Sequence, residues 1–190
     1  TRRDFGAGVD QVGDGFGLRA QRRIRRHDPF DRFYECHLTS RRRDSERSPC
    51  YKATPAEKAF LQDPQEALKQ KETWKCEDIW VLLWALGKVP SLGEMDALCN
   101  LDMVPEADFP FRGPASDPAA FLAGAAALRS ITEILDANDL YYRANWACVD
   151  ARIKGEKEPV HPGIVYERHY ALNWLINYRN QEWDEVTCDT

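Results

Sequence analysis

The chain lacks any apolar run long enough to cross a membrane. Its longest apolar stretch, residues 79–86, is far shorter than the ~20 residues that a membrane-spanning helix needs. The first residues are threonine, two arginines and an aspartate, followed by glycines, where a secretory signal would have an apolar segment. We therefore expect a cytoplasmic protein that does not bind membranes.

The chain also lacks the short motifs that identify common catalytic and metal centres. Its six cysteines form no CxxC pair, and no GxSxG, HxxxH or HExxH pattern occurs. Gly8 and Gly13 have the spacing of a phosphate-binding loop, but Asp14 and Gly15 follow where lysine and serine or threonine are required. We expect the cysteines to be free thiols in a reducing compartment, and we predict no metal and no cofactor.

Positive charge is scarce outside the first fifty residues. Residues 1–50 hold twelve Arg against eight Asp and Glu, whereas residues 51–190 hold fourteen Lys and Arg against twenty-three Asp and Glu. The main body is therefore acidic. This charge disfavours binding of nucleic acid to the main body and favours a basic protein partner. Any contact with RNA or with membrane phosphate would have to come from the N-terminal part.

Residues 1–50 are rich in glycine and arginine, and their apolar residues show no sustained period. We predict an irregular, weakly ordered N-terminal arm there. One alternative stays open for this arm, because Cys36, His37 and Cys50, together with His27, carry metal-ligating groups. Their spacing matches no standard zinc module.

What remains is large enough for one domain with a core: 43% of the residues are apolar, and six are tryptophan. The periodicity of residues 51–190 predicts an all-α fold, a single compact domain of five to six helices with no strand. A capping box at Thr54 and Glu57, with Pro55 at the first helical position, begins the first helix. The predicted helices span residues 54–70 with a break at Asp63 and Pro64, 73–86, 91–100, 117–128, 131–154 and 163–179.

The second helix is apolar on every side between residues 79 and 86, which places it in the middle of the core. Trp80 and Trp84 are therefore interpreted as core residues rather than as a ligand platform. Cys148 falls on the apolar stripe of the fifth helix and is interpreted as an inert thiol.

The last helix carries a cluster of polar residues among large apolar ones. Helical spacing points His169 into the core, puts Asn173 on the border of the same face and puts Arg168 on the flank. A buried imidazole needs hydrogen-bond partners, and the candidate carboxylates on the preceding helix are Asp150, Asp139 and Glu133.

Two interpretations of this cluster stay open. In the first it is a satisfied polar network that joins two helices. In the second it is a small cleft lined by Trp146, Trp174 and Tyr142, in which His169 acts as a base and Asp150 or Glu167 orients it. The sequence does not decide between them.

Several segments resemble the bacterial family catalogued as domain of unknown function 4272. The resemblance covers roughly residues 55–190, and it is most specific in residues 133–152, 163–175 and 183–190. It implies a small, mostly helical, cytosolic bacterial protein and no reaction. The candidate site residues that it marks are Arg143, Trp146, Asp150, Glu167, Arg168, His169, Asn173, Trp174 and Asp184.

From these observations we expect a non-enzymatic interaction protein whose unidentified partner is a basic protein. The alternative is an enzyme or a small-ligand-binding protein centred on His169, Asp150 and Glu167. In either case Arg143, Trp146, Arg168, Asn173 and Trp174 are the candidate binding residues.

Overall fold

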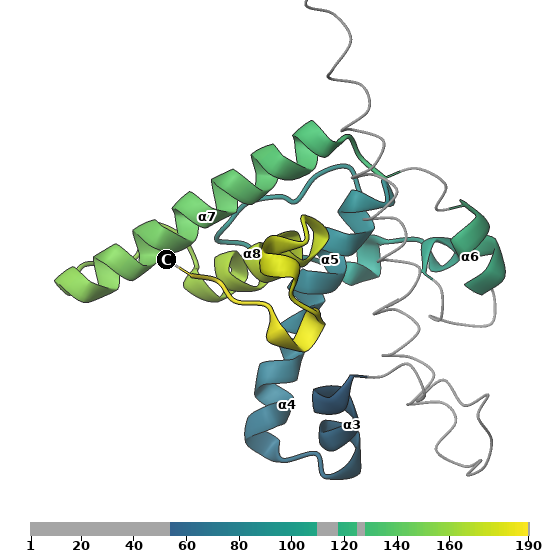
Figure 1. The fold of residues 1–190 in the computed structure, drawn as a ribbon, viewed down its shortest axis with the longest axis horizontal. Coiled ribbons are helices and arrows are strands. Elements are labelled where there is room, and N and C mark those ends of the chain that lie inside the picture. The colour runs from purple at the N-terminus through teal and green to yellow at the C-terminus, as the bar shows by residue number, and fades with distance from the viewer. Residues whose placement is uncertain (1–53, 110–117, 125–127, 190) are drawn as a thin grey trace, which may run out of the picture.

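A computed structural model describes residues 54–109, 118–124 and 128–189, and these residues contain no β-strand (Figure 1). The predicted all-α fold is confirmed. The predicted N-terminal arm, including the metal alternative at Cys36, His37 and Cys50, lies outside the described residues. The α-helices are α3 (Pro55–Gln62), α4 (Glu66–Thr73), α5 (Lys75–Ala85), α6 (Pro118–Gly124), α7 (Ile131–Lys154) and α8 (Pro162–Leu175), joined in places by 3-10 turns at Leu101–Met103, Glu106–Asp108, Tyr178–Asn180 and Trp183–Glu185.

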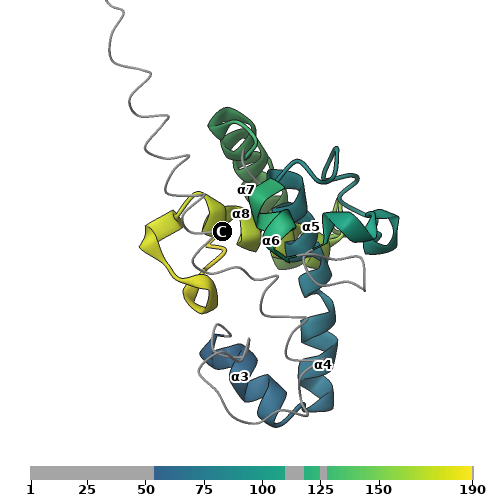
Figure 2. The same ribbon diagram turned by 90° about the vertical axis from the view of Figure 1, so that its right-hand side faces the viewer.

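Helices α3 and α4 form a hairpin at one end of the molecule (Figures 1 and 2). The predicted capping box is present, because the Thr54 hydroxyl accepts from the backbone N–H of Glu57 while the Glu57 carboxylate accepts from the N–H of Thr54. The predicted break is also confirmed, since α3 ends before Asp63 and α4 begins after Pro64. A carboxylate oxygen of Asp184 accepts from the N–H of Ala56, 3.2 Å away, which attaches the C-terminal segment to the start of α3.

Helix α5 lies in the core, as its continuous apolar sequence predicts. Its buried residues include Val81, Leu82 and Leu83. The chain leaves the helix through Gly87, whose φ of +71° is the left-handed conformation that favours glycine at this position. Trp74 joins α4 to α5, and its ring lies against Gly163 in the first turn of α8, where a Cβ atom would come within 3.2 Å of the ring. Glycine at this position therefore permits the two elements to approach closely.

The helix predicted for residues 91–100 is wrong, because this segment is irregular. Several of its backbone groups bond to side chains of other elements. The carbonyls of Glu94 and Ala97 accept from Arg168, and the N–H of Cys99 donates to Glu77. Gly93 adds a φ of +75°, which a right-handed helix does not contain.

Helix α6 is described over Pro118–Gly124, within the predicted helix, and the predicted last residue, Leu128, is not helical; residues 125–127 lie outside the described part. Ser130 then forms a capping box with Glu133 and starts α7. Helix α7 has 24 residues and ends where predicted. Gly155 follows its last residue in the left-handed conformation, with a φ of +69°. None of the helices in the described ranges is both long enough and apolar enough to span a bilayer.

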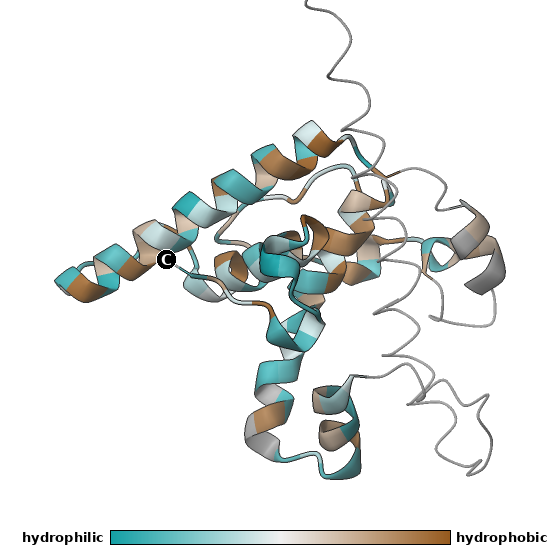
Figure 3. Cartoon of the chain, viewed as in Figure 1, coloured by the Kyte–Doolittle hydropathy of each residue, from teal (hydrophilic) through white to brown (hydrophobic). Residues whose placement is uncertain are grey.

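Helix α8 packs against α5 on one side and α7 on another. It ends at Leu175, whereas the sequence predicted an end at Arg179. The reason lies in the backbone, because Asn177, Arg179 and Asn180 all have positive φ values and a right-handed helix cannot continue through them. Hydropathy follows this packing: α5 and α8 are rich in apolar residues, whereas apolar and polar residues alternate along α7 (Figure 3).

Candidate functional site

A buried arginine on α8 organises the polar centre of the molecule. Arg168, which the sequence placed on the flank of its helix, is only 1% exposed. Its Nε donates to a carboxylate oxygen of Glu77 on α5 at 2.8 Å, and the Glu77 side chain is itself fully buried. Its Nη1 donates to the Tyr141 hydroxyl of α7 at 2.9 Å.

The same guanidinium holds the irregular segment 91–100 in place. Nη1 also donates to the carbonyl of Glu94 at 3.0 Å, and Nη2 donates to the carbonyl of Ala97 at 3.3 Å. The second carboxylate oxygen of Glu77 accepts from the N–H of Cys99 at 2.7 Å. One ion pair thus joins α5, α7, α8 and this segment, and each of its charges has hydrogen-bond partners, as a buried pair requires.

His169 is buried, as predicted, but it has no carboxylate partner among the described residues. The ring of Tyr142 contacts it edge-on, with 5.8 Å between ring centroids, and Nδ1 has no hydrogen-bond partner. Burial lowers the pKa of His169 from 6.5 to about 4, although a hydrogen bond with Asn173 opposes the shift. The imidazole is therefore neutral near pH 7.

The predicted pair between His169 and a carboxylate of α7 is wrong, because all three candidate acids have other partners. Asp150 pairs with Lys154 at 2.7 Å and Asp139 pairs with Arg143 at 2.6 Å, each one turn along α7. Glu133 belongs to the capping box at the start of the helix. The four-residue spacing of Asp139 and Arg143 places their side chains next to each other on the helix surface.

Asn173 and Trp174 also lie in the interior. The Asn173 amide accepts from the side chain of Asn138 on α7 and donates to the carbonyl of Thr187, so it joins α7, α8 and the C-terminal segment. The Trp174 ring is 1% exposed and meets the Trp183 ring edge-on at 5.2 Å. Both residues therefore hold the C-terminal segment against α8.

Sequence analysis missed an acidic residue that the fold brings near Glu167. Asp78 on α5 is 2% exposed, and its Oδ1 has no hydrogen-bond partner. Burial, and secondly the charge of Glu167, raise the pKa of Asp78 well above its usual value. Burial likewise raises the pKa of Glu167 to about 7. The signal in the sequence was an acidic pair, Glu77 and Asp78, placed directly before the most apolar run of the chain.

A pocket of about 420 Å³ lies between α7 and α8. Tyr166 and Cys188 line the pocket, and the charges of Glu167 and Asp78 act on both of these groups. Burial is the main cause that raises the pKa of Cys188 to about 12, and the two acids add to it. The full lining is Asn145, Cys148, Val149, Arg152, Glu158, Pro162, Gly163, Tyr166 and Cys188, so His169, Asp150 and Glu167 are not part of it.

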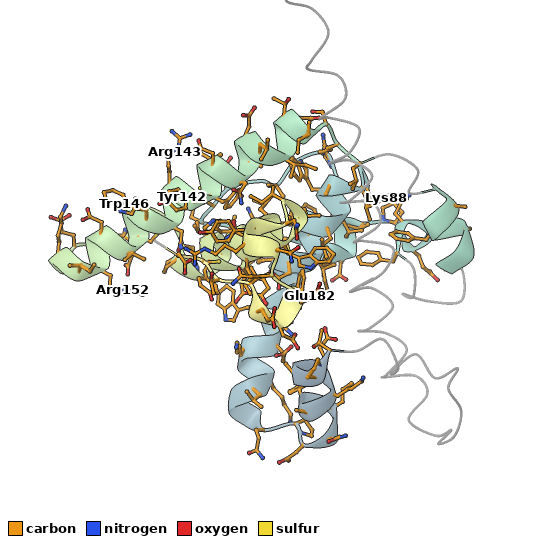
Figure 4. The ribbon with its side chains drawn as sticks, viewed as in Figure 1. Lys88, Tyr142, Arg143, Trp146, Arg152 and Glu182 are labelled. Atoms are coloured by element: carbon orange, nitrogen blue, oxygen red, sulfur yellow. The ribbon has the colours of Figure 1, made fainter. Side chains whose placement is uncertain are left out.

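The outer side of α7 carries the remaining candidate residues. Trp146 is 53% exposed and Tyr142 is 44% exposed, and the Arg143 side chain projects away from α7 and is largely exposed (Figure 4). Leu135 and Ile153 are also exposed. Separations of seven, four and seven residues place the four apolar side chains on one line, because they are close to whole numbers of 3.6-residue turns. We call Leu135, Tyr142, Trp146 and Ile153 the α7 stripe.

One group in the described ranges has the residue types of a metal site. The sulfur atoms of Cys76 and Cys99 and a carboxylate oxygen of Glu77 lie within 4.8 Å of one another. Both Glu77 oxygens, however, already accept hydrogen bonds, from Arg168 and from the Cys99 backbone. The two thiols are therefore the reactive part of this group.

A family model described as Domain of unknown function (DUF4272) matches residues 39–186. The chain belongs to this family. No curated protein and no solved structure shows a significant match to it.

Within this DUF4272 domain, the residues marked by the resemblance separate by position. Arg168, His169, Asn173 and Trp174 are buried, and their contacts hold the fold together. Arg143 and Trp146 are exposed on one helix, and Asp184 is exposed on the C-terminal segment. Asp150 and Glu167 are half-buried. Of the five predicted binding residues, only Arg143 and Trp146 are in a position to touch a large partner.

Proposed function

We propose that this DUF4272 domain is a non-enzymatic interaction module that binds a basic partner protein along the α7 stripe. The observation that carries the proposal is the row of exposed apolar side chains on α7, with Trp146 and Tyr142 at its centre. Tryptophan, tyrosine and arginine are the residues that most often dominate binding energy at protein interfaces. Arg143 supplies the third of these types beside the two rings.

The dimensions of the stripe favour an extended or helical partner. Leu135 and Ile153 are eighteen residues apart, which corresponds to about 27 Å along a helix. Exposed large apolar side chains that recur along one helix over this length are typical of interaction sites.

The charge of the domain favours a basic partner. Residues 51–190 have nine more acidic than basic residues. Exposed Asp136 and Asp139 lie next to the stripe, although Arg143 neutralises the second of them. A positively charged partner would therefore be attracted over the whole body before it docks on α7.

Photo-crosslinking in cells tests the proposal. A benzophenone amino acid replaces Ile153 on the stripe, which is 78% exposed, or Met103, which is 76% exposed and lies on a 3-10 turn outside α7. We expect a defined crosslinked partner from position 153 and none from position 103. Identical crosslinks from both positions would refute docking on α7.

The identified partner is then purified and its affinity measured. Trp146→Ala should weaken binding by roughly 30-fold or more, as expected for a central aromatic residue, while Met103→Ala should leave it unchanged. Binding should also weaken as the salt concentration rises, since the partner is basic. Equal affinity for both variants, or a partner with net negative charge, would contradict the proposal.

A second candidate function is the binding of a small cationic ligand in the pocket between α7 and α8. The acids Asp78 and Glu167 act electrostatically on the lining residues Tyr166 and Cys188, so an ionised Glu167 would attract a cation there. Small amines should raise the melting temperature at pH 8 more than at pH 5.5 in the wild type, and Glu167→Gln should remove this difference. No stabilisation by any amine at pH 8 would exclude this candidate.

A further inference from the structure

Two thiols lie close together where α5 begins. Cys76 is the second residue of α5, and Cys99 is near the end of the irregular segment 91–100. The Cys99 thiol donates to the backbone carbonyl of Cys76 at 3.4 Å, and the two sulfur atoms are within 4.8 Å of each other. Both residues are half-buried free cysteines.

The surroundings of the two thiols differ in a way that assigns them different roles. The N-terminus of a helix favours a thiolate. The pKa of Cys76 is lowered, chiefly by its interaction with the Cys99 side chain. The same interaction, together with burial, raises the pKa of Cys99. Cys76 therefore has the character of an attacking thiolate and Cys99 that of a resolving thiol.

The other described cysteines lack this arrangement. Cys148 is 3% exposed, and burial raises its pKa. Burial raises the pKa of Cys188 to about 12. Neither thiol is ionised near pH 7, and thiolates are the form that reacts with oxidants.

The geometry favours covalent chemistry over metal binding at this position. Glu77, the only other ligand type in the group, is fully buried and bonded to Arg168 and to the Cys99 backbone. A disulfide needs a sulfur–sulfur distance of about 2.05 Å. Cys99 is on an irregular segment, which the hydrogen bond from its N–H to Glu77 holds beside α5.

We propose that Cys76 and Cys99 form a dithiol site that hydroperoxides oxidise to an intramolecular disulfide. The Cys76 thiolate attacks one peroxide oxygen, so an S–O bond forms and the O–O bond breaks. The hydroxide that leaves hydrogen peroxide takes up a proton and becomes water, and Cys76 becomes a sulfenic acid.

The second step closes the disulfide. The Cys99 thiol gives up its proton and its sulfur attacks the sulfur of Cys76, so the S–S bond forms and the S–O bond breaks. The hydroxide released takes up that proton as the second water. Two thiols and one hydrogen peroxide thus give one disulfide and two waters.

The experiment treats the reduced full-length chain with an equimolar amount of hydrogen peroxide at pH 7 and maps the cysteines by mass spectrometry after proteolysis. We expect a peptide pair joined by Cys76 and Cys99. In Cys99→Ser, dimedone should trap a sulfenic acid on Cys76, whereas Cys148→Ser should form the same disulfide as the wild type at the same rate. Circular dichroism of each variant checks that it is folded.

Three outcomes would overturn the proposal. One is a disulfide that joins other cysteines in preference to this pair. Another is peroxide consumption at the wild-type rate in both Cys76→Ser and Cys76→Ala, provided that at least one of them is folded. The third is stoichiometric zinc in the purified chain that is lost in a Cys99→Ser variant with native circular dichroism, which would make this group a metal site instead.

Discussion

Replacing Arg168 with methionine should destabilise the domain more than any substitution on its surface. The change removes hydrogen bonds to Glu77, Tyr141 and the carbonyls of segment 91–100, and it leaves the Glu77 carboxylate at 0% exposure without its counter-charge. Breaking a buried ion pair from one side costs about 3–5 kcal/mol. Because domains are stable by only about 5–15 kcal/mol, this is a large part of the free energy of unfolding.

The assay is urea unfolding followed by circular dichroism, together with thermal melts. For a domain of this size, a loss of 3–5 kcal/mol lowers the melting temperature by roughly 6–20 °C. Arg143→Met is the matched control, because it breaks an ion pair with Asp139 in which both side chains are more than 60% exposed. Exposed pairs of this kind contribute about 0–1 kcal/mol.

A double-mutant cycle separates the ion pair from the packing of its members. Glu77→Gln with Arg168→Met removes both charges, so no buried charge remains without a partner, and the double variant should be less destabilised than the sum of the two single variants. If Arg168→Met costs no more than Arg143→Met, the central role assigned to this network is wrong.

Three further predictions concern titration and packing. Burial raises the pKa of Glu167 from 4.5 to about 7, so the contribution of Glu167 to stability should fall by up to roughly 3 kcal/mol as the pH rises through this range. In urea titrations Glu167→Gln should remove this contribution. Burial lowers the pKa of His169 from 6.5 to about 4, so the contribution of His169 to stability should be lost as the pH falls through that range. His169→Gln should remove this pH dependence. An unchanged pH profile of stability in the Glu167 or the His169 variant would contradict the pKa assigned to that residue. Trp84→Ala should lower the free energy of unfolding by about 3–5 kcal/mol in a thermal or urea melt, because Trp84 is only 7% exposed. Trp146 is exposed, so Trp146→Ala should lower it by less than about 0.5 kcal/mol. Similar melts for the two variants would refute the core assignment of Trp84.

The helix boundaries that could be predicted are those that neighbouring residues determine. Thr54 and Glu57 bond to each other's backbone across three residues, and Gly155 adopts the left-handed conformation directly after α7. Pro162 begins α8 with a residue that needs no N–H partner. Each of these signals acts over one helical turn, so the sequence alone contains the necessary information.

The segment that was predicted wrongly is governed by distant residues. Ser91 and Glu94 have the spacing of a capping box, but Arg168, more than seventy positions away, takes the carbonyls of Glu94 and Ala97. A charged donor in a buried position forms stronger hydrogen bonds than the turn of a short helix, so the tertiary contacts decide the local conformation. No local pattern could reveal this competition.

The placement of the polar residues on α8 could be predicted only in part. Periodicity placed His169 in the core, and this was correct because α7 covers that face of α8. It placed Arg168 on the flank, because the pattern of a single helix does not show that α5 covers the adjacent face as well. Asp78 was missed for the same reason, since its neighbour Glu167 is far away in the sequence and only the packing of α5 on α8 brings the two acids near each other.

The two titrating residues of α8 act on stability in opposite directions. His169 faces Tyr142 on α7, and its contribution rises with pH between about 4 and 6.5, whereas Glu167 is close to Asp78 on α5, and its contribution falls between 4.5 and about 7. In the overlap of these ranges the two slopes largely cancel, so the contribution of this pair is nearly independent of pH. Compared with the wild type, Glu167→Gln should therefore shift the slope of stability against pH upward in this range, and His169→Gln should shift it downward.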